Sequence, residues 1–138
     1  MSQSSDLIQS AQRTIRLELE AVEGLLAHID ADFVRACEMI LASKGRVVVV
    51  GMGKSGHVGN KIAATLASTG TTAFFVHPAE ASHGDMGMIT RDDVIVALSN
   101  SGTTNEIVTL LPLIKRLGIK LISMTGNPDS TLAKAAEV

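Results

Sequence analysis

The sequence has very few aromatic residues and a single cysteine, and both scarcities narrow what the chain can do. Its 138 residues include no Trp or Tyr, and aromatic side chains make up 2% of the chain. Single-stranded nucleic acids are bound by stacking bases on such side chains, so this class of partner is disfavoured. The net charge of −2 at pH 7 also argues against nucleic acid, whose partners carry a basic surface. The lone Cys37 excludes an internal disulfide, and its place on the apolar side of an expected helix predicts a buried structural thiol.

Long apolar runs are also absent, since none approaches the ~20 residues that a membrane-spanning helix needs. Residues 1–6 contain neither a basic region nor an apolar run, so the sequence shows no sign of a secretory signal. We therefore expect a cytoplasmic protein with no membrane partner. With 46% hydrophobic and 19% charged residues, the chain is long enough for one domain with its own core.

The chain is organised around a strand, a glycine turn and a helix within residues 46–60. The β-branched run Val47–Val50 suits a strand buried on both faces, as in a parallel sheet. The turn Gly51-Met52-Gly53-Lys54-Ser55-Gly56 follows, and then apolar residues at helical spacing: Val58, Ile62, Ala63 and Leu66. A helix that begins directly after such a turn points free N–H groups at one spot, which favours an anion. Lys54 adds a positive charge and Ser55 a hydroxyl, so we interpret the turn as half of a phosphate site.

The rest of the chain alternates between helical and strand patterns. We expect helices over residues 5–29, 31–42, 53–68 and 105–118, the last broken at Pro112, and a short helix from Thr131. Strands are expected over residues 47–50, 72–76, 94–98 and 120–124. The expected inward side chains of the second and fourth helices are Phe33, Cys37, Ile40 and Leu41, and Ile107, Leu110, Leu111, Ile114 and Leu117. The apolar stripe of the first helix would pack either on its own domain or on a second copy.

This rhythm predicts an α/β fold, an open parallel sheet with helices on both faces, and we take its strands to follow the flavodoxin-like order 2-1-3-4. Residues 1–138 would form a single domain. A fifth strand would start at about Val138, so we expect a domain truncated at its C-terminus.

A second turn of small residues, Ser99-Asn100-Ser101-Gly102-Thr103-Thr104, follows the third strand. In the order 2-1-3-4, the first and third strands are neighbours whose connections leave in opposite directions, and ligands bind in the crevice beyond their carboxyl ends. Gly53, Lys54 and Ser55 would then face the hydroxyls and amides of residues 99–104 around one phosphate monoester. The first turn also matches G-x-G-x-x-G, but the second strand lacks the acidic residue at its end that a dinucleotide needs.

Four titratable residues are expected beside this phosphate site: His77, His83, Asp85 and Glu106. His77, His83 and Asp85 lie in the segment after the second strand, and Glu106 lies in the first turn of the helix after Thr104. Their shared position at the carboxyl edge of the sheet makes them candidates for acid–base chemistry.

Three motifs together resemble the sugar isomerase (SIS) domain of the arabinose-5-phosphate isomerase family. They are Gly51-Met52-Gly53-Lys54-Ser55-Gly56-His57, His77-Pro78-Ala79-Glu80-Ala81-Ser82-His83-Gly84-Asp85 and Ser99-Asn100-Ser101-Gly102-Thr103-Thr104-Asn105-Glu106. The serine-rich turn by itself indicates only an SIS domain. Lysine in the first turn together with His-Gly-Asp indicates the isomerase branch.

The resemblance implies a five-stranded SIS domain that interconverts D-arabinose 5-phosphate and D-ribulose 5-phosphate for Kdo and lipopolysaccharide synthesis. It implies catalytic roles for Lys54, His83 and Glu106. It also implies substrate contacts at a wider set of residues: Gly53, Ser55, Gly70, Thr71, His77, His83, Ser99, Asn100, Ser101, Thr103 and Thr104. His77 matches a position linked to zinc, which the family does not clearly need for turnover, so no cofactor is expected to be required.

The family also implies a homo-oligomer, a dimer or a tetramer. It carries a further catalytic histidine and a pair of CBS modules downstream, which residues 1–138 do not contain. Two alternatives stay open: a sugar-phosphate sensor, as in SIS-containing transcriptional regulators, and another SIS isomerase or lyase.

Aldose–ketose isomerisation moves a proton between C1 and C2 through an enediol(ate). The reaction needs a base, a group that stabilises the developing oxyanion, and a group that opens the sugar ring. We assign Glu106 as base, Lys54 as stabiliser and His83 to ring opening or proton shuttling, although the sequence permits these roles to be permuted.

Overall fold

The computed structural model describes residues 3–82 and 84–138, and the chain divides into two compact units, residues 1–34 and 35–138. In the first unit, helix α1 (Gln3–Gly24) is followed by a 3₁₀ helix, η1 (Leu25–His28), which confirms the long N-terminal helix. The α-helix ends at Gly24, where glycine weakens a helix. Within the described ranges, no helix combines the length and apolar character that crossing a membrane requires.

Helix α2 (Ala31–Leu41) begins directly after Asp30, whose side chain caps it. The Asp30 carboxylate accepts hydrogen bonds from the amides of Asp32 at 2.9 Å and Phe33 at 3.3 Å. These bonds satisfy two of the amides that a helix start leaves without partners.

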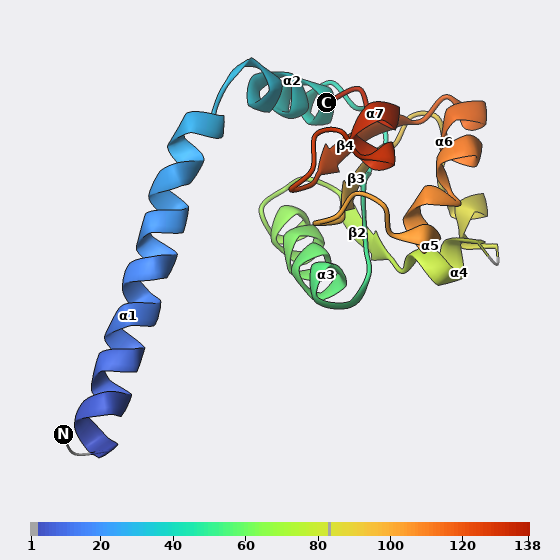
Figure 1. Cartoon of the computed structure of the whole chain (residues 1–138). Coiled ribbons are helices and arrows are strands. Elements are labelled where there is room, and N and C mark those ends of the chain that lie inside the picture. The colour runs from blue at the N-terminus through green and yellow to red at the C-terminus, as the bar shows by residue number, and fades with distance from the viewer. Residues whose placement is uncertain (1–2, 83) are drawn as a thin grey trace. The chain divides into compact units, whose positions relative to one another are not determined.

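The second unit contains a four-stranded parallel sheet in the order β2-β1-β3-β4, which confirms the predicted topology (Figure 1). The strands are β1 (Val47–Gly51), β2 (Ala73–Val76), β3 (Val94–Leu98) and β4 (Lys120–Met124). The connecting helices are α3 (Gly53–Ser68), α4 (Pro78–Ser82), η2 (Asp85–Met88), α5 (Asn105–Val108), α6 (Leu111–Leu117) and α7 (Thr131–Ala135). The bounds of α3, of α5 with α6, and of α7 agree closely with the predicted ones, including a break just before Pro112.

The two faces of the sheet carry separate cores, because successive side chains of a strand point to opposite sides. On one face, Val48, Val50, Ile95 and Leu121 pack with side chains of α5, α6 and α7 and of the residues between α5 and α6, among them Ile107, Leu110, Ile114 and Leu132. On the other face, Val47, Val49, Val96 and Ile122 pack with Ala63 of α3 and with Ala36, Met39 and Ile40 of α2. The predicted helical cover on both faces is therefore confirmed.

Several predicted inward side chains point to solvent instead. Phe33 and Leu41 of α2 are 49% and 83% exposed, and Leu117 is 41% exposed. In α2 the packed face runs through Ala36, Met39 and Ile40, so the predicted face was rotated by about one position. Cys37 is free but only half-buried, so full burial of its thiol was also wrong.

Helix α3 packs through its glycines, and for this reason Val58 is 55% exposed. A methyl group on Gly56 would lie 2.7 Å from the Gly51 carbonyl oxygen, and one on Gly59 would lie 3.1 Å from Val49. Both distances are shorter than van der Waals contact, so a methyl group at Gly56 would clash with the backbone and one at Gly59 would crowd Val49. The apolar pattern correctly placed Ile62, Ala63 and Leu66 against the sheet, but it placed Val58 there instead of the glycines.

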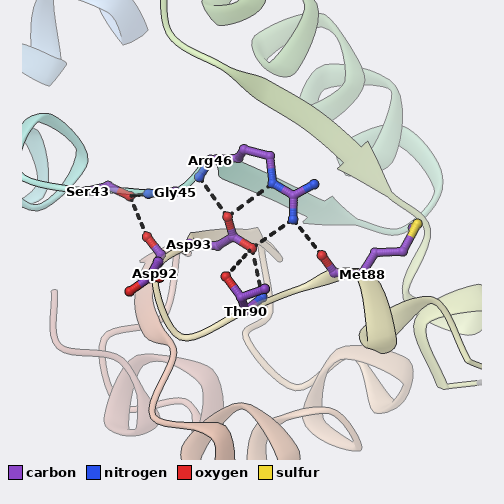
Figure 2. Close-up of polar contacts among 7 residues, drawn as sticks. All are labelled: Ser43, Gly45, Arg46, Met88, Thr90, Asp92 and Asp93. Atoms are coloured by element: carbon purple, nitrogen blue, oxygen red, sulfur yellow. Dashed lines mark hydrogen bonds and ion pairs between the residues drawn. The ribbon is translucent and has the colours of Figure 1, made fainter.

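At the amino edge of the sheet, Arg46 and the buried Asp93 form an ion pair at 3.0 Å (Figure 2). The Asp93 carboxylate also accepts hydrogen bonds from the amides of Arg46 and Thr90, at 2.7 and 2.8 Å. Burial alone would raise the pKa of Asp93, but the hydrogen bonds from Arg46 and Thr90 outweigh it and lower the pKa to about 2. This network joins the starts of β1 and β3 at the edge opposite the predicted phosphate site.

Candidate active site

Two turns begin side by side at the carboxyl edge of the sheet. β1 and β3 are neighbours, and Gly51, the last residue of β1, pairs with Leu98, the last residue of β3. The glycine turn leaves β1 at Met52, and the serine-rich turn leaves β3 at Ser99. The structure therefore brings together the two starting points that the sequence predicts to flank one anion.

The first turn leads directly into α3. Met52 is extended, Gly53 has a φ of +54°, and the helix begins at Gly53. The N-cap residue, Met52, makes no side-chain hydrogen bond to the start of α3. Lys54 is exposed and Ser55 is half-buried. The uncapped amides and the ammonium group together make this turn suitable for an anion.

The serine-rich turn is held in shape by its own first and last residues. Ser99 is 3% exposed, and its hydroxyl lies 2.7 Å from that of Thr104 and accepts a 3.0 Å hydrogen bond from the Gly102 amide. Ser101 and Thr103 are exposed, and the hydroxyl of Ser101 accepts hydrogen bonds from the amide and hydroxyl of Thr103 at 3.2 Å. Ser99 thus maintains the turn, while Ser101, Thr103 and the exposed Asn100 are open to a ligand.

The remaining predicted site residues do not all lie at the carboxyl edge of the sheet. Glu106 is half-buried in the first turn of α5, and the half-buried His77 follows β2 directly, so both are at the carboxyl edge. His83 lies outside the described residues. Gly70 and Thr71 precede β2 and therefore lie at the amino edge, because Ala73 pairs with Val47 at the start of both strands. Within one chain, Gly70 and Thr71 therefore lie at the opposite edge of the sheet from the other predicted site residues.

A zinc site at His77 has no supporting ligand set in the described ranges. Residues 3–82 and 84–138 hold no group of three His, Cys, Asp or Glu side chains that could bind a metal ion. Zinc in proteins normally takes three or four such ligands, so the described residues do not fit the ion. Zinc binding at His77 stays a prediction, and no chemical step is derived from it.

Two cavities in the second unit lie away from the paired turns. A groove of about 820 Å³ is lined by residues of α5, α6, β4 and α7, including Leu111, Ile114 and Lys134. A smaller cavity of about 320 Å³ is lined by residues of α2, including Glu38, by Lys120 at the start of β4, and by residues that follow α7. Neither is lined by residues of the two turns.

The chain is a member of the SIS domain family, whose model matches residues 40–138. It is 80% identical over all 138 residues to the arabinose 5-phosphate isomerase KdsD of Pseudomonas aeruginosa. It is 57% identical over 133 residues, 96% of the chain, to KdsD of Yersinia pestis. The chain spans 42% and 40% of the length of these relatives. It also resembles a protein of Escherichia coli CFT073 solved in complex with arabinose 5-phosphate, with 43% identity and a TM-score of 0.93 over the whole chain and 73% of that protein.

The exposure of Ser101 leads to a prediction about phosphate affinity. We expect Ser101→Ala to raise the Kd for a sugar phosphate at least about tenfold, because a hydrogen bond to a charged group contributes about 1.5–3 kcal/mol. Calorimetry with arabinose 5-phosphate measures this change. Ser68→Ala is the matched control, because the Ser68 hydroxyl bonds to Thr65 within α3, at the amino edge. Unchanged affinity in Ser101→Ala would exclude its hydroxyl from the phosphate site.

Proposed function

We propose that this chain is the SIS domain of an aldose–ketose isomerase that interconverts D-arabinose 5-phosphate and D-ribulose 5-phosphate for Kdo and lipopolysaccharide synthesis. The supporting observation is the 80% identity over the whole chain to a KdsD arabinose 5-phosphate isomerase. The placement of the turns at one edge supports the same conclusion, since one supplies a cation and uncapped amides and the other exposed hydroxyls. These groups suit the phosphate of the substrate.

The proposed chemistry is proton transfer between C1 and C2 through an enediol(ate). Glu106, half-buried beside the serine-rich turn, takes the proton as general base. Lys54, in the facing turn, stabilises the negative charge that develops on the substrate oxygen. His83 opens the sugar ring or shuttles a proton. Binding of the phosphate between the turns would hold the reacting carbons close to these groups.

A deuterium-exchange experiment tests this proposal directly. When the chain is incubated in D₂O with arabinose 5-phosphate, we expect deuterium to enter C2, as observed by NMR. Binding without exchange would contradict catalysis by this chain and would favour a sugar-phosphate sensor. Exchange with another sugar phosphate, but none with arabinose 5-phosphate, would favour a different SIS isomerase.

We further propose that the protein acts as a homo-oligomer. In the first unit, large apolar side chains are more than half exposed: Leu7, Ile8, Ile15, Leu17, Leu19, Val22, Leu25 and Leu26. Apolar surface of this extent marks an interaction site. Substrate contacts by Gly70 and Thr71 would then come from a second copy, because they lie at the opposite edge of the sheet from the turns.

We also propose a cytoplasmic location, where the charged sugar phosphate would be retained because it does not cross membranes.

A further inference from the structure

We propose that the turn between β4 and α7, residues 125–130, positions the serine-rich turn for phosphate binding. The proposal rests on the proposed function, because it assigns supporting residues to the same site. None of these residues was predicted to take part in the site from the sequence, which indicated only a turn. Their effect would be indirect, through the backbone of residues 100–102, so they are positioning residues.

The first link joins the two turns at Asn100. β3 and β4 are paired up to Leu98 and Met124, so the two turns leave neighbouring strands at the same level. The carbonyl oxygen of Asn100 accepts hydrogen bonds from the Gly126 amide at 3.0 Å and from the Thr125 hydroxyl at 3.3 Å. The Thr125 hydroxyl in turn accepts a 3.2 Å bond from the Asn127 amide. The residue immediately before Ser101 is thus fixed by two donors from outside its own turn.

The second link joins Gly102 to the start of α7. The Gly102 carbonyl oxygen accepts a 3.0 Å hydrogen bond from the amide of Leu132, which is fully buried in the core. Gly102 has a φ of +66°, and a methyl group built on it would collide with the buried Ser130 side chain. The Ser130 hydroxyl also caps α7 by accepting a hydrogen bond from the Ala133 amide at 3.2 Å. The segment around Ser101 is therefore anchored on both sides to an element that is itself anchored in the core.

Such anchoring has a consequence for affinity. A ligand that binds a pre-formed turn does not lose free energy in ordering it, and polar groups hold a ligand tightly only when they are rigidly placed. The exposed Ser101 and Thr103 have hydrogen bonds only to each other, as far as the described contacts show. Their placement therefore depends on Asn100 and Gly102, and through these on residues 125–132.

Gly126→Ala is the sharpest test, because it strains the link without touching the phosphate-facing hydroxyls. An alanine methyl there would lie 2.8 Å from the Asn100 side-chain oxygen and 3.2 Å from its carbonyl oxygen. Gly126 does not have a positive φ, so alanine fits its backbone conformation. We expect the Kd for arabinose 5-phosphate to rise about five- to tenfold, which corresponds to the weakening of one hydrogen bond. Gly24→Ala is the matched control, because no described atom lies within 4 Å of its added methyl.

A second pair of variants separates the hydroxyl from the shape of the side chain. Thr125→Val keeps the shape but removes the donor to Asn100, so we expect weaker binding. Thr125→Ser keeps the hydroxyl and should restore most of the affinity. In deuterium exchange at saturating substrate, Gly126→Ala and Thr125→Val should keep the maximal rate within about twofold, because positioning of the phosphate acts mainly on KM.

NMR of the free chain makes the test independent of catalysis. We expect the amide signals of residues 100–104 to shift in Gly126→Ala and to stay in place in Gly24→Ala. If these signals shift but the affinity for arabinose 5-phosphate is unchanged, the positioning role is wrong. If they do not shift, the link itself is wrong. A parent chain that binds no sugar phosphate at all would instead contradict the proposed function, and the positioning role with it.

Discussion

Replacing Glu106 with Gln should lower isomerisation at least about a hundredfold, the lower range for loss of a general base. Gln has nearly the same size as Glu but cannot accept the proton from carbon. Glu106 is half-buried in the first turn of α5, directly after the serine-rich turn, so the amide should fit where the carboxylate lies. We therefore expect the loss in kcat rather than in substrate binding.

The measurement is the rate of deuterium entry into C2 of arabinose 5-phosphate, made with the 138-residue chain and with any longer form that contains it. Glu38→Gln is the matched control, because Glu38 is exposed on α2, in another part of the unit. Calorimetry on Glu106→Gln should show sugar-phosphate affinity close to that of the parent chain. Near-normal exchange in Glu106→Gln would assign the base to another residue, with His83 as the first candidate.

The largest expected effect on stability comes from Asp93→Asn. The neutral amide would leave the Arg46 guanidinium without its ion pair and would weaken the bonds from the amides of Arg46 and Thr90. Loss of one partner of a buried pair costs about 3–5 kcal/mol, and the 37% exposure of the Arg46 side chain places the expected loss near ~2–3 kcal/mol. Asp92→Asn is the matched control, because the neighbouring Asp92 is exposed and bonds Ser43 and Gly45 through its carbonyl oxygen, which the substitution keeps.

The effect of Asp93→Asn should also depend on pH. The pKa of Asp93 is lowered from 3.8 to about 2 in the folded protein, so its carboxylate stabilises the fold fully above pH 3.8. That contribution is lost as the pH falls through about 2. Urea unfolding should therefore show the gap between parent and Asp93→Asn narrowing as the pH is lowered over this range. A gap that stays constant would show that the ionised pair does not carry the stability.

The sequence predicted the sheet well, because each strand is an almost continuous apolar run and the glycine and serine turns mark where strands end. The alternation of strands and helices indicated a parallel sheet, and the order assumed for it is the one observed. The break near Pro112 followed from the missing amide. Helix faces were predicted less well. In α3 the predicted Ile62, Ala63 and Leu66 do pack on the sheet. Gly56 and Gly59 pack there as well, in place of the predicted Val58, and periodicity of apolar side chains cannot detect packing by glycine.

For the site, the sequence indicated which turns leave neighbouring strands at one edge of the sheet, but not how each hydroxyl is used. Ser99 and Ser101 look equivalent in the sequence, yet one is buried and bonded within the turn and the other is exposed. The support from Thr125 and Gly126 was missed because it depends on contacts between turns of neighbouring strands. The strand order alone could have indicated it, since β4 ends beside β3.

A crystal structure of this chain with arabinose 5-phosphate would show whether the two turns bind the phosphate together. We expect the phosphate between the two turns, within hydrogen-bonding distance of the first amides of α3 and of the Ser101 hydroxyl, with Lys54 beside it. A phosphate bound at any other edge or groove, with the two turns empty, would contradict the account.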